Sequence, residues 1–94
     1  MIVHIVFFRF KEEDKQKNMD RVKSDLEALQ MDGLIKLEVG REIVGSERSW
    51  DMSLYSEFAT QEDLEAYQVF EPHVKAVTFI KQVCSEIAAV DYIK

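Results

Sequence analysis

Apolar side chains recur along the chain at two spacings, every second residue in some segments and every third or fourth in others. Residues 2–10 are β-branched and aromatic and therefore predict a strand. Alternation places five side chains on one face of it, namely Ile2, His4, Val6, Phe8 and Phe10. The other face, with Val3, Ile5 and Phe7, is also largely apolar. We therefore expect this strand to be central and covered on both sides.

Residues 12–31 have the spacing of an amphipathic helix with one apolar stripe. The stripe consists of Met19, Val22, Leu26 and Leu29. The acidic residues at the start of this segment suit the positive end of a helix dipole. Gly33 is expected to end the helix in the left-handed conformation that glycine adopts easily.

Two strands are predicted in the middle of the chain. Residues 34–44 alternate and predict the first of them, with Gly40 as a bulge. After a polar turn at 45–49, residues 50–58 alternate as a half-buried antiparallel strand. One face of it would carry Trp50, Met52, Leu54 and Phe58, and the other Asp51, Ser53, Tyr55 and Glu57.

The only proline of the chain divides a second helical region. Thr60 to Asp63 resembles a capping box that opens a helix to about Phe70. Pro72 suits the first position of a new helix, which would continue to about Cys84. Its core-facing stripe would be His73, Val77, Ile80 and Cys84. Residues 86–93 predict a final strand.

The predicted order is β-α-β-β-α-β, which is a ferredoxin-like α+β fold formed as one domain over residues 1–94. In this fold the helices cover one face of a four-stranded antiparallel sheet. The opposite face would expose Val3, Ile5 and Phe7, and an uncovered apolar face usually marks an interface. A homodimer through that face is therefore expected.

Composition and charge exclude several classes of function. Twelve Lys and Arg against 18 Asp and Glu give a net charge of −6, which argues against nucleic acid and anionic membranes as partners. Cys84 is the only cysteine, so no internal disulfide can form and a cytoplasmic location is expected. No nucleotide-binding, nucleophile-elbow or CxxC motif occurs, and the two histidines lack metal-ligand spacing.

The remaining candidate chemistry lies in His4, Tyr67 and His73, which the predicted elements direct into the layer between the helices and the sheet. A neutral histidine beside a tyrosine hydroxyl can act as a general base next to an oxyanion donor. Burial and the helix start would lower the pKa of His73 and favour its neutral form. These side chains are expected to line a cavity. The alternative is that they are hydrogen-bonded core residues.

Several segments together resemble the stress-responsive A/B barrel (Dabb) family over the whole chain. They are VHIVFFRF at 3–10, LEVG at 37–40, WDMSLYSEF at 50–58, AYQV followed by His73, and VDYI at 90–93. The resemblance implies a homodimeric α+β barrel in which two sheets pack face to face. One relative, olivetolic acid cyclase, closes a linear polyketide without a cofactor, and its catalytic positions match His4, Tyr67 and His73.

The chain departs from the family at one place, since Phe70-Glu71-Pro72-His73 stands where His-Pro-x-His is common. Three functions remain open. The first is a stress-related dimer that binds a small apolar or carbonyl-containing ligand. The second is a cofactor-independent cyclase or isomerase that uses His73 and Tyr67. The third is a cofactor-free monooxygenase of the related barrel type.

Overall fold

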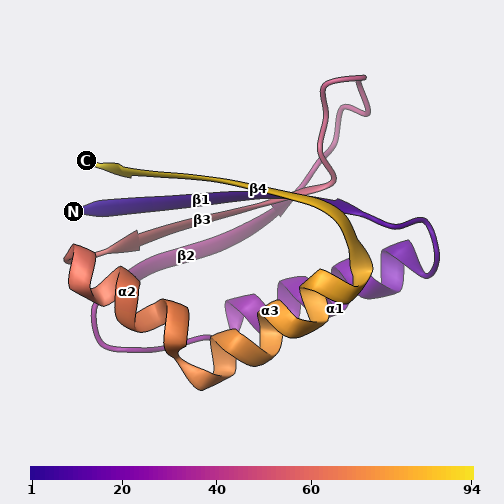
Figure 1. The fold of residues 1–94 in the computed structure, drawn as a ribbon. Coiled ribbons are helices and arrows are strands. Elements are labelled where there is room, and N and C mark those ends of the chain that lie inside the picture. Colours follow the sequence, from indigo (N-terminus) through magenta and orange to yellow (C-terminus); the bar gives the residue numbers. More distant parts are fainter.

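The computed structural model describes residues 1–94 as a ferredoxin-like α+β fold, which confirms the predicted class (Figure 1). The elements are β1 (Ile2–Phe10), α1 (Lys15–Glu27), β2 (Leu34–Arg41), β3 (Met52–Phe58), α2 (Gln61–Val69), α3 (Glu71–Val83) and β4 (Cys84–Ile93). The strands form one antiparallel sheet in the order β2-β3-β1-β4, and all three helices lie on the same face of it.

Strand β1 lies inside the sheet, between β3 and β4, as its two apolar faces predict. His4 pairs with Ser56 on β3 and with Asp91 on β4. Its even-numbered side chains face the helices, and Phe8 and Phe10 are each only 3% exposed. The core between sheet and helices also contains the predicted stripe of α1, since Met19, Val22, Leu26 and Leu29 are all buried.

Helix α1 is shorter than predicted at both ends. It begins after Asp14, whose left-handed backbone (φ 52°) cannot belong to a right-handed helix. It ends at Ala28, so the prediction that Gly33 terminates the helix was wrong. Gly33 instead lies in the connection to β2 with φ +89°, where an added Cβ would lie 2.2 Å from Cγ of Asp63. Close approach of another side chain, as well as the backbone conformation, requires glycine there.

The central strands are also shorter than predicted. Strand β2 ends at Arg41 and β3 begins at Met52, so residues 42–51 form a loop. The bulge lies between Leu34 and Lys36, whereas Gly40 pairs regularly with Ser53, and the prediction of a bulge at Gly40 was wrong.

The second helical region is divided as predicted. Thr60 caps α2 by accepting a hydrogen bond from the backbone N–H of Asp63 at 3.1 Å. Pro72 is the second residue of α3 rather than the first. Cys84 was placed wrongly on the helix stripe and is instead the first residue of β4, because α3 ends at Val83.

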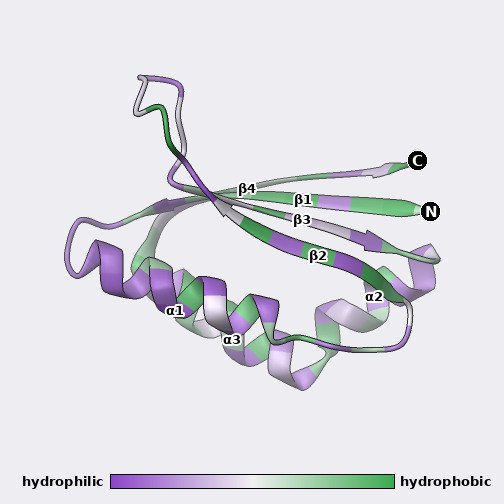
Figure 2. Cartoon of the chain, turned by 180° about the vertical axis from the view of Figure 1, so that it is seen from behind, coloured by the Kyte–Doolittle hydropathy of each residue, from purple (hydrophilic) through white to green (hydrophobic).

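The sheet face opposite the helices is uncovered (Figure 2), and apolar side chains of β1 and β4 lie on it. Phe7, Val90 and Tyr92 on this face are 41%, 59% and 45% exposed. Ile5 is half-buried among them, and Val3 is fully covered by its neighbours. We refer to this surface as the open face. None of the three helices combines the length and apolar character that a membrane crossing requires.

Candidate functional site

Three elements bring the predicted site residues together in the layer between sheet and helices. His4 lies on β1, Tyr67 on α2 and His73 in the first turn of α3. They are 7%, 0% and 7% exposed. The ring centroids of Tyr67 and His73 are 4.0 Å apart, and those of His4 and Tyr67 are 6.5 Å apart. The side chains therefore form one buried cluster, which we call the His–Tyr cluster.

The break between α2 and α3 produces the contact between Tyr67 and His73. In a continuous helix, two residues six positions apart would point about 120° away from each other and lie about 9 Å apart along the axis. Phe70 instead has an extended backbone (φ −65°, ψ 121°), as expected for the residue that caps the start of a helix. The backbone N–H of Phe70 donates a hydrogen bond to the carbonyl of Tyr67 at the end of α2. The carbonyl of Phe70 accepts a hydrogen bond from the N–H of Val74 in α3. This single extended residue redirects the chain so that the two rings stack.

Asp91 is a fourth member of the site that the sequence did not single out. It lies opposite His4 on β4, and its carboxylate pairs with Nδ1 of that histidine. A histidine that donates its Nδ1–H to a carboxylate carries its lone pair on Nε2, so Asp91 can fix the tautomer of His4. The only signal in the sequence was one acid within the otherwise apolar segment 87–93.

Two polar atoms of the cluster make no hydrogen bond of regular geometry within the protein. They are the hydroxyl oxygen of Tyr67 and Nδ1 of His73, and both are buried. An unsatisfied buried polar group costs about 1–3 kcal/mol, so such groups are rare in folded proteins and usually have a specific role. Two of them in touching rings indicate a place where a polar atom of a ligand can bind.

Burial sets the protonation states of both groups. It lowers the pKa of His73, and the nearby His4 lowers that pKa further, whereas backbone groups of Gln68 and Tyr67 raise it and offset part of the shift. This is the direction that the sequence predicted, and it keeps the imidazole neutral near pH 7. Burial raises the pKa of Tyr67, so its hydroxyl keeps the proton. The pair therefore combines a neutral base with a neutral hydrogen-bond donor.

The cluster is closely packed on one side and reaches solvent on the other. The ring of Phe58 lies 5.0 Å from that of Tyr67, and none of the five main cavities is lined by His4, Tyr67 or His73. The expected cavity is thus not among them. On the β4 side, however, the Asp91 side chain is 47% exposed and Ile87 is 44% exposed. Solvent therefore comes nearest to the cluster at Asp91, which pairs with His4.

Comparison with known proteins gives a family and a set of related folds. The profile of the stress responsive A/B barrel domain matches residues 2–94. No curated protein matches the chain.

Among solved structures, a dimeric protein of unknown function with a ferredoxin-like fold from Bacteroides fragilis is 31% identical, with a TM-score of 0.90. The match covers 99% of this chain and 95% of that one. A dimeric ferredoxin-like protein of unknown function from Thermobifida fusca is 20% identical, with a TM-score of 0.91 and coverage of 99% and 90%. The hydroxynitrile lyase from Passiflora edulis is 21% identical, with a TM-score of 0.87 and coverage of 99% and 92%. The last two matches show a shared fold.

Proposed function

This chain belongs to the stress responsive A/B barrel domain family, and from that premise we propose that it is a homodimer that binds a small carbonyl compound at the His–Tyr cluster. The observation that supports ligand binding is a pair of buried polar atoms without hydrogen bonds of regular geometry, the Tyr67 hydroxyl and Nδ1 of His73. A carbonyl oxygen is an acceptor without a donor of its own, so it suits the hydroxyl of Tyr67. The apolar surroundings of the cluster suit the hydrocarbon part of such a ligand.

A second candidate function is proton transfer on the bound carbonyl compound, and the lowered pKa of His73 favours it. Nδ1 of the neutral imidazole takes a proton from the carbon next to the carbonyl. The C–H electron pair becomes a C=C bond, and the carbonyl π electrons move to the oxygen as negative charge. The Tyr67 hydroxyl donates a hydrogen bond to that oxygen as the charge develops. Return of the proton restores the ketone, and attack of the enolate carbon on a second carbonyl of the same molecule would form a ring.

The Passiflora relative supports the same substrate class. A hydroxynitrile is the adduct of cyanide and a carbonyl compound, so the name of that protein also implies chemistry at a carbonyl carbon. The breakdown of a hydroxynitrile begins with removal of the proton from its hydroxyl group, and a neutral histidine can accept that proton.

The dimer is supported by the open face and by the relatives. Burial of Phe7, Val90 and Tyr92, which are 41–59% exposed in one copy, would supply the apolar contact of an interface. The Bacteroides and Thermobifida proteins are both described as dimeric. Glu57 also lies on this face, but its carboxylate accepts hydrogen bonds from the Tyr55 hydroxyl at 2.6 Å and from Lys94 at 3.3 Å. The charge is therefore already paired within one copy.

Acetophenone, a small ketone with an exchangeable methyl group, is the probe for both candidate functions. We expect it to shift the imidazole NMR signals of His73, and Tyr67→Phe should weaken this binding. Tyr92→Phe, at an exposed tyrosine, is the matched control and should bind normally. Absence of any shift at saturating acetophenone would contradict the binding site.

Exchange of the acetophenone methyl protons in D2O separates catalysis from binding. General-base catalysis typically contributes about 10²–10⁴-fold, so the protein should accelerate exchange and His73→Gln should abolish the acceleration. Binding without accelerated exchange would leave the ligand site in place and remove the enzymatic function.

A further inference from the structure

The loop of residues 42–51 projects from the end of the sheet, on the side away from the helices (Figures 1 and 2). Its first limb, just after β2, carries Ile43 and Val44, which are 94% and 75% exposed. Ile43 is the most exposed of the large apolar residues in the chain. We refer to this loop as the arm. Two adjacent aliphatic side chains held in water on a projection form a typical candidate for a protein contact.

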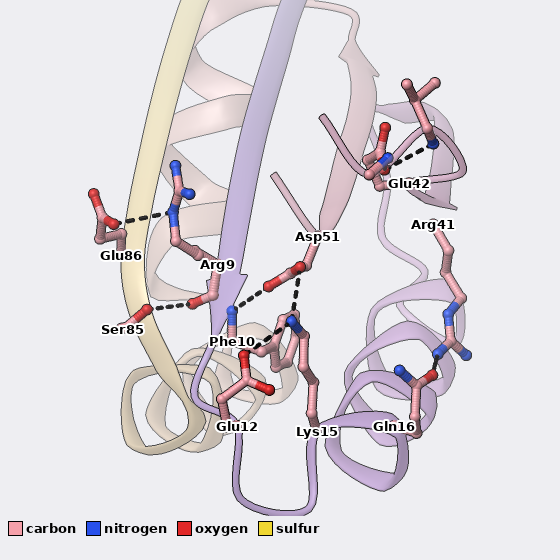
Figure 3. A network of polar contacts seen from close by, with 12 residues as sticks. Arg9, Phe10, Glu12, Lys15, Gln16, Arg41, Glu42, Asp51, Ser85 and Glu86 are labelled. Atoms are coloured by element: carbon pink, nitrogen blue, oxygen red, sulfur yellow. Dashed lines mark hydrogen bonds and ion pairs between the residues drawn. The ribbon is translucent and has the colours of Figure 1, made fainter. Parts of the chain in front are cut away.

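The base of the arm is anchored to the body of the protein (Figure 3). The backbone N–H of Glu42 donates to the carbonyl of Asp51 at 3.0 Å and closes the loop. The Asp51 carboxylate accepts from the backbone N–H of Phe10 at 2.8 Å and pairs with Lys15 at 3.1 Å. At the end of β2, the Arg41 guanidinium donates hydrogen bonds to the side chains of Asp20 and Gln16 on α1. The direction of the arm is therefore fixed relative to β1 and α1.

The arm is also ordered by its own hydrogen bonds. The Glu42 carboxylate accepts from the backbone N–H groups of Val44 at 2.9 Å and Gly45 at 2.7 Å. Gly45 has φ +73°, which allows the chain to reverse there. Beyond it, the backbone N–H of Ser46 donates to the Ser49 hydroxyl at 3.0 Å. Apolar side chains on a segment that is ordered before it meets a partner lose little conformational entropy on binding.

The open face and the arm together would supply the contact area of a dimer. Four strands about 4.8 Å apart and about 30 Å long give a planar footprint of roughly 550 Å², and a standard interface buries about 800 Å² of accessible surface per partner. The arm rises on the same side as that face and extends it. Trp50 at the base of the arm connects the two surfaces, since its ring lies 6.2 Å from that of Phe7 on the open face. A hollow of about 370 Å³ lies between them, lined in part by Phe7, Trp50 and Arg48.

We propose that Ile43 and Val44 of the arm pack against a second copy of this chain and become buried when two open faces meet. This inference rests on the proposed homodimer. In a two-fold symmetric dimer each contact occurs twice, so the arm of each copy would pack against the other copy. The partner surface that suits Ile43 and Val44 is apolar, because the exposed atoms of these two side chains are aliphatic.

The test compares two double variants of the full chain by analytical ultracentrifugation over a range of concentrations. Ile43→Asp with Val44→Asp introduces two charges on the arm. Val69→Asp with Val74→Asp introduces the same charges at residues of α2 and α3 that are 78% and 45% exposed and lie on the helices, away from the open face and the arm. We expect the arm variant to raise the dimer dissociation constant at least tenfold, because four aliphatic side chains per dimer lose their burial. The control should change it less than threefold.

The outcomes distinguish the arm from the dimer. A wild-type chain that stays monomeric at micromolar concentration would overturn both proposals. A dimer whose dissociation constant is the same in the arm variant and in the control would overturn the arm alone. A second measurement uses Trp50, the only tryptophan. Its emission should shift to the red as the wild-type dimer is diluted, because water reaches the base of the arm, and an unchanged spectrum across dissociation would contradict the arm contact.

Discussion

Asp91 lies directly opposite His4 on the neighbouring strand, and its carboxylate pairs with Nδ1 of that histidine. The histidine is buried, whereas the aspartate side chain is 47% exposed. The pair therefore connects the His–Tyr cluster to solvent at the edge of the sheet. Removal of the Asp91 charge on β4 should change the tautomer of the His4 imidazole on β1. This change can be measured without knowledge of the natural ligand.

Asp91→Asn should weaken the preference of His4 for the tautomer that is protonated on Nδ1, because a neutral amide is a poorer acceptor than a carboxylate. The ¹⁵N shifts of the His4 imidazole report this directly. If the cluster catalyses exchange, the rate should also fall, because the His4 ring lies beside Tyr67. Glu86→Gln, at an exposed acid on the same strand, is the control, and equal effects of both variants would contradict the assigned role.

Tyr67→Phe should leave the free energy of unfolding unchanged within about 1 kcal/mol, or raise it. A hydroxyl with a protein partner usually contributes about 1 kcal/mol, but that of Tyr67 has none and is desolvated in the folded state. Urea unfolding measures the change. A loss above 2 kcal/mol would show that the hydroxyl has a structural partner and would weaken the case for a ligand.

Stability should fall on acidification because of His73. Burial lowers the pKa of His73 in the folded state, so near pH 6 the unfolded chain binds more protons than the folded one. The free energy of unfolding therefore rises with pH in this range. It decreases as the pH falls through about 6.5 toward the folded pKa, with a slope of at most about 1.4 kcal/mol per pH unit. Urea unfolding at fixed protein concentration should show a smaller pH dependence for His73→Gln, and an equal dependence would contradict the assignment.

Leu26→Ala should lower the free energy of unfolding by about 2–5 kcal/mol, the range for buried leucines. Leu26 lies in the middle of the α1 stripe and is 1% exposed. Lys17→Ala on the exposed side of the same helix is the control and should change stability by less than about 0.5 kcal/mol. A loss below 1 kcal/mol for Leu26→Ala would be inconsistent with the packing described.

Periodicity predicted the parts of the fold that depend on one buried face. Met19 and Leu26 mark the inner side of α1 because their spacing matches a helical turn, and Met52 and Leu54 do the same for a strand. The same reasoning directed His4 and His73 into one layer, and Pro72 indicated where the new helix starts. Each of these inferences needs only the local sequence.

What the sequence did not reveal depends on contacts between distant segments. Asp91 joins the site only through the register of β4 on β1, which the local pattern of either strand does not determine. Ile43 and Val44 continue the apolar character of β2, so they predicted a longer strand. That strand ends because the Glu42 carboxylate binds the N–H groups of Val44 and Gly45. Gly33 was misjudged because the side chain that requires it, Asp63, comes from another helix.

The position of β1 between β3 and β4 also has a kinetic consequence. His4 and Ser56, which face each other on β1 and β3, are 52 residues apart in the chain, and His4 and Asp91 are 87 apart. The first strand therefore has no local partner, and the hairpin of β2 and β3 is the only sheet pairing that can form early. Proteins dominated by such long-range pairings fold slowly. We expect refolding on the millisecond-to-second timescale, which stopped-flow fluorescence of Trp50 would measure, and the His–Tyr cluster should assemble in its last phase.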